Sequence, residues 1–93
     1  MPSSFEWDVS KAEINLRKHA VPFEYATLVF SDIHRCDWID DRNDYKEERR
    51  ITIGYVHGRL ITVVYTERNE QTIRLISARK ATHYEQKRYF EKI

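Results

Sequence analysis

The sequence predicts a single α+β domain over residues 1–93, a small antiparallel meander sheet with two N-terminal helices and one C-terminal helix. A chain of 93 residues suits one domain. Segments with the 3.6-residue apolar period of helices lie near both ends, and segments that alternate like strands lie between them. With two glycines and two prolines, connections should be short, and strands joined by short turns pair antiparallel. We expect the helices to cover one face of the sheet.

Residues 5–7 alternate apolar and polar side chains and predict a short first strand. A helix then begins at Asp8 or Ser10 and ends near His19. Ser10 followed by Glu13 fits a capping box, in which each side chain bonds the backbone N–H of the other residue. The apolar residues that would face the core from this helix are Val9, Ala12 and Leu16.

A second helix is expected over residues 22–31, because Pro22 suits a first helical turn, where the N–H group needs no partner. Apolar residues occupy most of its circumference, so it should be largely buried. They are Phe23, Tyr25, Ala26, Leu28, Val29 and Phe30.

Four strand-like segments follow, and the third is rich in β-branched residues. The strands are expected at residues 35–40, 48–56, 60–66 and 71–77, joined by a polar loop at 41–47 and turns at 57–58 and 68–70. Thr82 with Glu85 forms another capping box and predicts a C-terminal helix that ends near residue 92. Its packing face would be Gln86, Tyr89, Phe90 and Ile93.

The chain has no apolar run near the ~18 residues of a membrane span, and its start lacks the charged and apolar regions of a signal peptide. Cys36 is the single cysteine, so no internal disulfide can form. We therefore expect a cytoplasmic protein without membrane contact.

Charge is distributed unevenly along the chain. Residues 1–48 contain six basic and eleven acidic residues, a net charge of −5, whereas residues 49–93 contain ten basic and four acidic residues, a net charge of +6. Seven of those ten basic residues are arginine, which binds phosphate with two parallel hydrogen bonds. The cationic half indicates an anionic partner such as nucleic acid, and the alternative is a solvated basic face.

Three stretches, in order along nearly the whole chain, resemble the BrnT-type toxins of bacterial type II toxin–antitoxin systems. The first is Trp7-Asp8-x-x-Lys11-Ala12-x-x-Asn15-Leu16-x-Lys18-His19-x-Val21-x-Phe23-x-x-Ala26. The second is Glu48-Arg49-x-Ile51-x-Ile53-Gly54. The third is Tyr65-Thr66-Glu67-Arg68, followed by Ile73-Arg74-Leu75-Ile76-Ser77-Ala78-Arg79-Lys80-Ala81-Thr82 and then by Glu85 and Tyr89.

The resemblance implies a RelE-like fold and a ribonuclease that arrests translation and uses neither cofactor nor metal. It also implies an antitoxin of the BrnA type with a ribbon-helix-helix DNA-binding domain, so that operator DNA is contacted only through the antitoxin. This family usually has glycine where this chain has Ala20. Because alanine adopts the left-handed conformation of a helix cap only at a cost, the join between the first two helices should differ.

Arg74 lies within an apolar, strand-like segment. If Ile73 and Leu75 face the helices, alternation places Arg74 on the open face of the sheet, where Thr62, Val64 and Thr66 of the neighbouring strand would join it. A guanidinium group beside hydroxyl groups suits a phosphate that crosses the sheet. The alternative is a structural ion pair with Glu67 or Glu48.

Cleavage of RNA without a metal needs a base for the 2′-hydroxyl, positive charge at the phosphorus and an acid for the leaving oxygen. We assign the charge to Arg74 and Arg79, and the base to Glu67 or His19, with His83 as a candidate acid. RNA binding is assigned to Lys18, His19, Arg68 and Lys80. We expect Arg79 and Lys80 in an exposed loop before the last helix, whose N-terminus favours anions, whereas Lys18 and His19 also suit the end of the first helix structurally.

Two alternative functions stay open. The chain could be a non-catalytic module that bridges antitoxin and operator DNA, because no clear acid and base pair is visible. It could also be a metal-dependent nuclease that uses the acidic run around the 41–47 loop, although that run lacks the glycine and spacing of a calcium loop and is better explained as solvated. The run consists of Asp37, Asp40, Asp41, Asp44, Glu47 and Glu48.

Overall fold

The computed structural model describes residues 4–42 and 46–92. The elements in chain order are the strand β1 (Ser4–Glu6), the helices α1 (Val9–His19) and α2 (Phe23–Ala26), the 3-10 helix η1 (Thr27–Ser31), the strands β2 (Cys36–Asp40), β3 (Arg49–Val56), β4 (Arg59–Glu67) and β5 (Thr72–Lys80), and the helix α3 (His83–Lys92). Each predicted element is present, although the predicted second helix is divided into α2 and η1.

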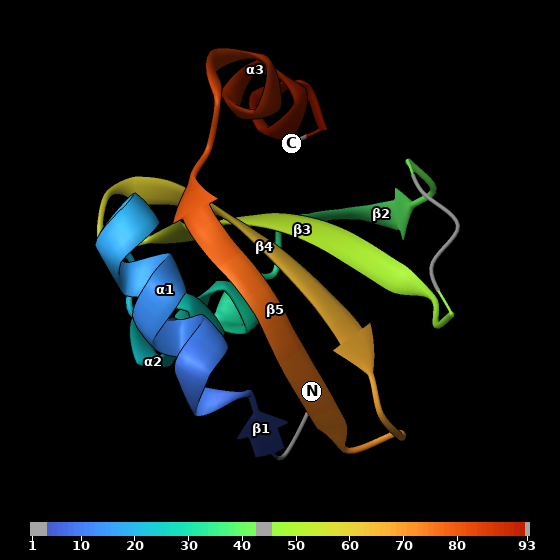
Figure 1. Ribbon diagram of the computed structural model, residues 1–93. Coiled ribbons are helices and arrows are strands. Elements are labelled where there is room, and N and C mark those ends of the chain that lie inside the picture. The colour runs from blue at the N-terminus through green and yellow to red at the C-terminus, as the bar shows by residue number, and fades with distance from the viewer. Residues whose placement is uncertain (1–3, 43–45, 93) are drawn as a thin grey trace.

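The five strands form one sheet in the order β1-β5-β4-β3-β2. Strands β2 to β5 form the antiparallel meander that the sequence predicts. The prediction of a purely antiparallel sheet is wrong, because β1 pairs in parallel with the start of β5. Nothing local in the sequence indicates this pairing, which joins segments at opposite ends of the chain (Figure 1).

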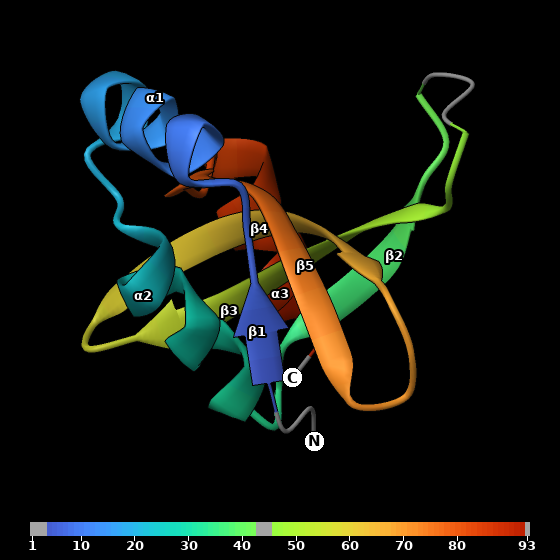
Figure 2. The same ribbon diagram turned by 60° about the horizontal axis from the view of Figure 1, so that its bottom comes forward.

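The helices cover both faces of the sheet, not one as expected. In Figure 2, α1 and α2 lie in front of the sheet and α3 lies behind it. The larger core cluster lies between α2, η1 and one sheet face and includes Phe23, Val29, Ile61 and Leu75. A smaller cluster joins Tyr89 of α3 to Ile53 and Cys36 on the other face. We call the sheet face that carries the larger cluster the α1/α2 face and the face that carries the smaller cluster the α3 face.

Helix α1 is capped by Asp8, whose side chain accepts a hydrogen bond from the backbone N–H of Lys11 (3.0 Å). Of the predicted apolar stripe, Ala12 packs against the larger core cluster, but Val9 is 68% exposed and Leu16 is 46% exposed. Asn15 is the buried residue of this helix. The helix docks through hydrogen bonds of this amide rather than through a broad apolar face.

The Asn15 side chain completes the edge of β5. Its Nδ2 donates to the carbonyl oxygens of Val21 (3.1 Å) and Ala78 (2.9 Å), and its Oδ1 accepts from the Ala78 N–H (3.1 Å). Strand β1 reaches only as far as Arg74 along β5. Asn15 therefore satisfies backbone groups farther along this edge, which would be costly to bury unpaired.

Gly54 allows η1 to approach β3. A Cβ atom at this position would lie 2.7 Å from the Val29 Cγ1, closer than real Cβ atoms approach, and 3.0 Å from the Val29 carbonyl oxygen. On α3, Tyr89 is buried as predicted, but Phe90 is 51% exposed; Ile93 lies outside the described residues. In the described part of the chain, no helix is long and apolar enough to cross a membrane.

Ala20 ends α1 in the left-handed conformation, with φ 58° and ψ 27°. Residues with a Cβ atom lose roughly 1 kcal/mol or more in this conformation, so Ala20→Gly should raise the free energy of unfolding by about 1 kcal/mol. Urea unfolding measures this change. The control is Ala12→Gly, within the same helix, which should lower stability by about 1 kcal/mol; destabilisation by both substitutions would contradict the strain at Ala20.

Candidate nucleic-acid interface

Arg74 and Arg79 lie on the same face of the sheet. The register pairs Arg74 with Thr66 and Arg79 with Thr62, and these threonines alternate with the core residues Ile61, Val63 and Tyr65. Both arginines therefore belong to the α3 face. In a regular strand, two residues five positions apart point to opposite faces. The register shift between Val64 and Tyr65 adds one residue to β5 and brings the two arginines to one side.

Arg74 is held by a carboxylate from β1. Its Nη1 donates to Glu6 Oε2 (2.7 Å), and its side chain is 34% exposed. Arg68 Nε lies 3.4 Å from the same oxygen. Arg68 Nη1 also lies 3.7 Å from Glu47 Oε2, so these two arginines and two carboxylates together have no net charge. The predicted alternation, with Ile73 and Leu75 toward the core and Arg74 on the other face, is confirmed, but that face is not open as expected, because α3 packs on it. The alternative ion pair also exists, but with Glu6 rather than with Glu67 or Glu48.

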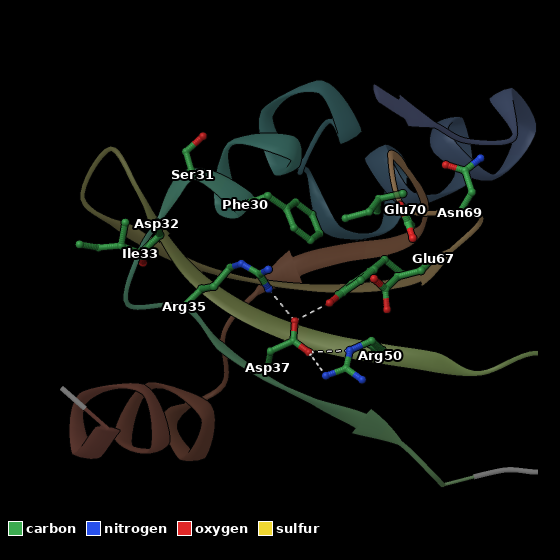
Figure 3. A pocket seen from close by; sticks show the side chains of 12 residues that line it. Phe30, Ser31, Asp32, Ile33, Arg35, Asp37, Arg50, Glu67, Asn69 and Glu70 are labelled. Atoms are coloured by element: carbon green, nitrogen blue, oxygen red, sulfur yellow. Dashed lines mark hydrogen bonds and ion pairs between the residues drawn. The ribbon is translucent and has the colours of Figure 1, made fainter. Parts of the chain in front are cut away.

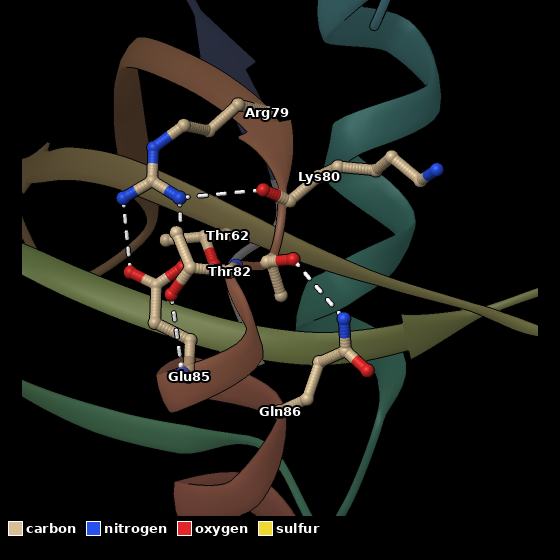
Figure 4. A network of polar contacts seen from close by, with 7 residues as sticks. Thr62, Arg79, Lys80, Thr82, Glu85 and Gln86 are labelled. Carbon is tan, nitrogen blue, oxygen red and sulfur yellow. Dashed lines mark hydrogen bonds and ion pairs between the residues drawn. The ribbon is translucent and has the colours of Figure 1, made fainter.

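Arg79 and Lys80 are the last residues of β5, so the prediction of a loop there is wrong. Pairing with Thr62 and Ile61 of β4 extends the strand to this point. The two side chains point to opposite sides of the strand (Figure 4). Lys80 is exposed, whereas Arg79 is 31% exposed and forms a two-pronged ion pair with Glu85, at 2.7 Å from Nη1 to Oε1 and 2.9 Å from Nη2 to Oε2.

Glu85 accepts further hydrogen bonds from the Thr62 hydroxyl (3.0 Å) and the Thr82 N–H (2.8 Å). The second of these belongs to the predicted capping box, which is confirmed because the Glu85 N–H donates to Thr82 Oγ1 (3.2 Å). Burial alone would raise the pKa of Glu85, but the hydrogen bonds from Arg79, Thr82 and Thr62 and the charge of Arg79 lower this pKa to about 2. Glu85 therefore connects α3 to β4 and β5 (Figure 4).

Lys18 and His19 form the end of α1, the helix that Asn15 attaches to β5 at Ala78. Lys18 is exposed and His19 is half-buried. Burial lowers the pKa of His19, and the positive charges of Lys18 and Arg79 lower it further. The charges of Lys18 and Arg79 thus both act on His19. A neutral imidazole is the state expected for His19 at neutral pH.

Glu67 does not lie with Arg74 and Arg79. It belongs to the α1/α2 face, where it lines a cleft of about 790 Å³ with Asp37, Arg50 and Tyr65 (Figure 3). Asp37 lies within β2, as the predicted strand at 35–40 implies, but it is not solvated as its acidic run suggested. Asp37 Oδ2 accepts from Arg35 Nη1 (2.6 Å) and from the Tyr65 hydroxyl, and its Oδ1 accepts from Arg50 Nε (2.8 Å).

The network at Asp37 was missed because it depends on strand register. Arg50 of β3 pairs with Ile39 of β2 and with Tyr65 of β4. Arg50 and Tyr65 therefore lie on the same face as Asp37, two residues before Ile39. Burial and the hydrogen bond to Asp37 raise the pKa of Tyr65 to about 12. The cleft is anionic, because its lining contains four carboxylates and two arginines. It is therefore less suited to a phosphate backbone than the α3 face is.

Several of the acidic residues predicted as an alternative metal site are paired with cations. Asp37 contacts Arg35 and Arg50, and Arg42 donates from Nε to Asp40 Oδ1 (2.7 Å). Asp44 lies outside the described residues. Within the part of the chain that the structure describes, no group of three His, Cys, Asp or Glu side chains could hold a metal ion.

The fold is that of a known class of small bacterial toxin. The fold is similar to the 1.1 Å crystal structure of the ribonuclease toxin BrnT from Brucella abortus, with a TM-score of 0.62 and 22% sequence identity over 86% of this chain and 97% of that chain. At this identity the similarity shows the fold. No curated protein matches the chain.

The family follows from the sequence. The family described as "ribonuclease toxin, BrnT, of type II toxin-antitoxin system" matches residues 7–85. The chain belongs to this family, whose systems pair a toxin with an antitoxin.

The pKa of Glu85 predicts a loss of stability in acid. Its folded-state pKa of about 2 lies below the ordinary value of 4.5, so the ionised carboxylate stabilises the fold above pH 4.5, and this contribution of roughly 3 kcal/mol is lost as the pH falls toward 2. Urea unfolding between pH 7 and pH 2 measures the loss. The Glu85→Gln protein should lose less stability over this range; an equal loss would contradict the assignment.

Proposed function

We propose that residues 1–93 form one RelE-like toxin domain that cleaves RNA in the cytoplasm without a metal ion and thereby arrests translation. Its partner is a ribbon-helix-helix antitoxin of the BrnA type, and operator DNA is contacted only through that antitoxin. The family membership supports the general activity. The arrangement of charge on the α3 face supports the choice of substrate.

The observation that carries this proposal is the position of the family-motif residues on one sheet face. Arg74, Ser77 and Arg79 of β5 lie opposite Thr66, Val64 and Thr62 of β4. The two arginines are neither fully buried nor fully exposed, and one carboxylate fixes each of them. Guanidinium groups with a fixed orientation bind a phosphate with little loss of side-chain freedom.

The chemistry requires positive charge at the reacting phosphorus. When the 2′-oxygen attacks, the phosphorane gains negative charge, and arginines already in place stabilise that charge without reorganisation. We assign this role to Arg74 and Arg79. The outlying residues Lys18, His19, Arg68 and Lys80 would contact the RNA backbone on either side of the cleaved bond. The effect of the three charged side chains among them falls with rising salt concentration.

Substitution of the two arginines tests the site. Arg74→Gln and Arg79→Lys should each lower kcat/KM for RNA cleavage by roughly 10²-fold, since each removes a fixed charge contact to the transition state. Arg79→Lys keeps a cation beside Glu85, so that the fold is retained. Arg59→Gln is the control, because Arg59 is exposed at the start of β4. Wild-type rates in both site variants would exclude the α3 face as the cleavage site.

Growth and chelation assays test the function itself. Expression of the toxin alone should stop growth, and co-expression of the adjacent antitoxin should restore it. Cleavage by the purified protein should persist in EDTA. A protein that binds antitoxin and operator DNA without affecting growth would instead be the non-catalytic module, and loss of cleavage in EDTA would indicate a metal-dependent nuclease.

A further inference from the structure

We propose that Glu6 is the general base of RNA cleavage, an inference that rests on the proposed function. Glu6 lies in β1, directly beside Arg74 in the parallel pairing of β1 with β5. Its Oε2 accepts the 2.7 Å hydrogen bond from Arg74 Nη1. Glu6 lies just outside the family match, which covers residues 7–85, and outside the sequence motifs.

The position of Glu6 is fixed by its neighbours in the strand. Phe5 packs against Phe30 with ring centroids 5.4 Å apart, on the α1/α2 face. Successive residues of a strand point to opposite faces, so Ser4 and Glu6 point to the α3 face. The Ser4 and Thr72 hydroxyl groups lie 2.7 Å apart and secure the start of the strand pair. Glu6 is therefore held in place by the core rather than by a mobile loop.

The Glu6 carboxylate is free to accept a proton. Both of its cationic contacts in the described part of the chain, Arg74 Nη1 and Arg68 Nε, are made to Oε2, which leaves Oε1 open to a substrate. The side chain is 40% exposed. A base needs this combination of a fixed position and an accessible lone pair.

The other carboxylates near the arginines do not offer this combination. Glu85 lies on the same face but accepts hydrogen bonds from three residues, which hold its pKa at about 2 and make it a weak base. Glu67, one of the two bases expected from the sequence, lines the cleft on the opposite face. Glu6 is the carboxylate in direct contact with Arg74.

The reaction balances with residues of this chain and water. Glu6 Oε1 takes the proton of the ribose 2′-hydroxyl, and the 2′-oxygen forms a bond to phosphorus. The bond from phosphorus to the 5′-oxygen breaks, and that oxygen takes a proton from water. The products are a 2′,3′-cyclic phosphate and a 5′-hydroxyl, and Glu6 returns its proton to solvent.

The contact between Glu6 and Arg74 couples the two roles. Before the reaction, the negative carboxylate attracts the guanidinium group. Protonation of Glu6 removes that negative charge at the step in which the phosphorane acquires its own. The attraction of Arg74 and Arg68 is thereby transferred to the transition state, which is the state that an enzyme must stabilise.

The test is Glu6→Gln in the full-length protein, because glutamine keeps an oxygen that accepts from Arg74 but cannot act as a base. We expect kcat/KM for cleavage of a short RNA to fall by at least roughly 10²-fold, with circular dichroism and thermal unfolding unchanged. The wild-type rate should rise with pH as one group loses a proton, and the variant should lose this dependence. Glu6→Asp should restore part of both the rate and the dependence.

Glu48→Gln is the matched control. It also removes a carboxylate that contacts an arginine, here Arg50 at 3.7 Å, and it should cleave at the wild-type rate. Cleavage by Glu6→Gln at the wild-type rate, or a loss of rate with an unchanged pH dependence, overturns the role of Glu6 and leaves the proposed function in place. A loss of activity in Glu67→Gln but not in Glu6→Gln would assign the base to the other face. A wild-type protein that does not cleave RNA overturns both proposals.

Discussion

The register shift between Val64 and Tyr65 decides which residues of β5 share a face. On one side of the shift, Ile73 and Leu75 point into the core between the sheet and α2; on the other side, Ala78 does so. The intervening residue lets the strand keep its apolar side toward the core while Arg74 and Arg79 both point away from it. Without it, the second arginine would have to enter the core, where an unpaired charge is very unfavourable.

Arg74 and Arg79 differ in how many of their nitrogens are already bound to a carboxylate partner. Arg79 gives two of its nitrogens to Glu85, and that pair also links α3 to the sheet, so this guanidinium group supports the fold as well as the surface charge. Arg74 gives one nitrogen to a half-exposed carboxylate. Partly exposed ion pairs of this kind add little to stability. The pair of Arg74 with Glu6 is therefore the one whose groups are most available for contacts with a ligand.

Local patterns in the sequence were sufficient for much of the fold. Alternation and short turns predict β2 to β5, the Thr82 and Glu85 pattern predicts the start of α3, and the neighbours Ile73 and Leu75 predict the outward position of Arg74. The pairing of β1 with β5 was not predictable, because it joins residues far apart in the sequence, and with it the contact of Glu6 with Arg74 was missed. Asp37 was expected in a strand but as part of a solvated acidic run, because its arginine and tyrosine partners lie on strands whose register the sequence does not reveal.

Asn15 has a consequence for how this molecule meets other copies of itself. The donor and the acceptor at Ala78 are the groups to which a foreign strand would attach, and exposed strand edges of this kind promote aggregation. The side-chain amide of Asn15, on α1, already forms hydrogen bonds with both of these groups. Growth of the sheet beyond its own five strands is thus blocked at this point by a single side chain.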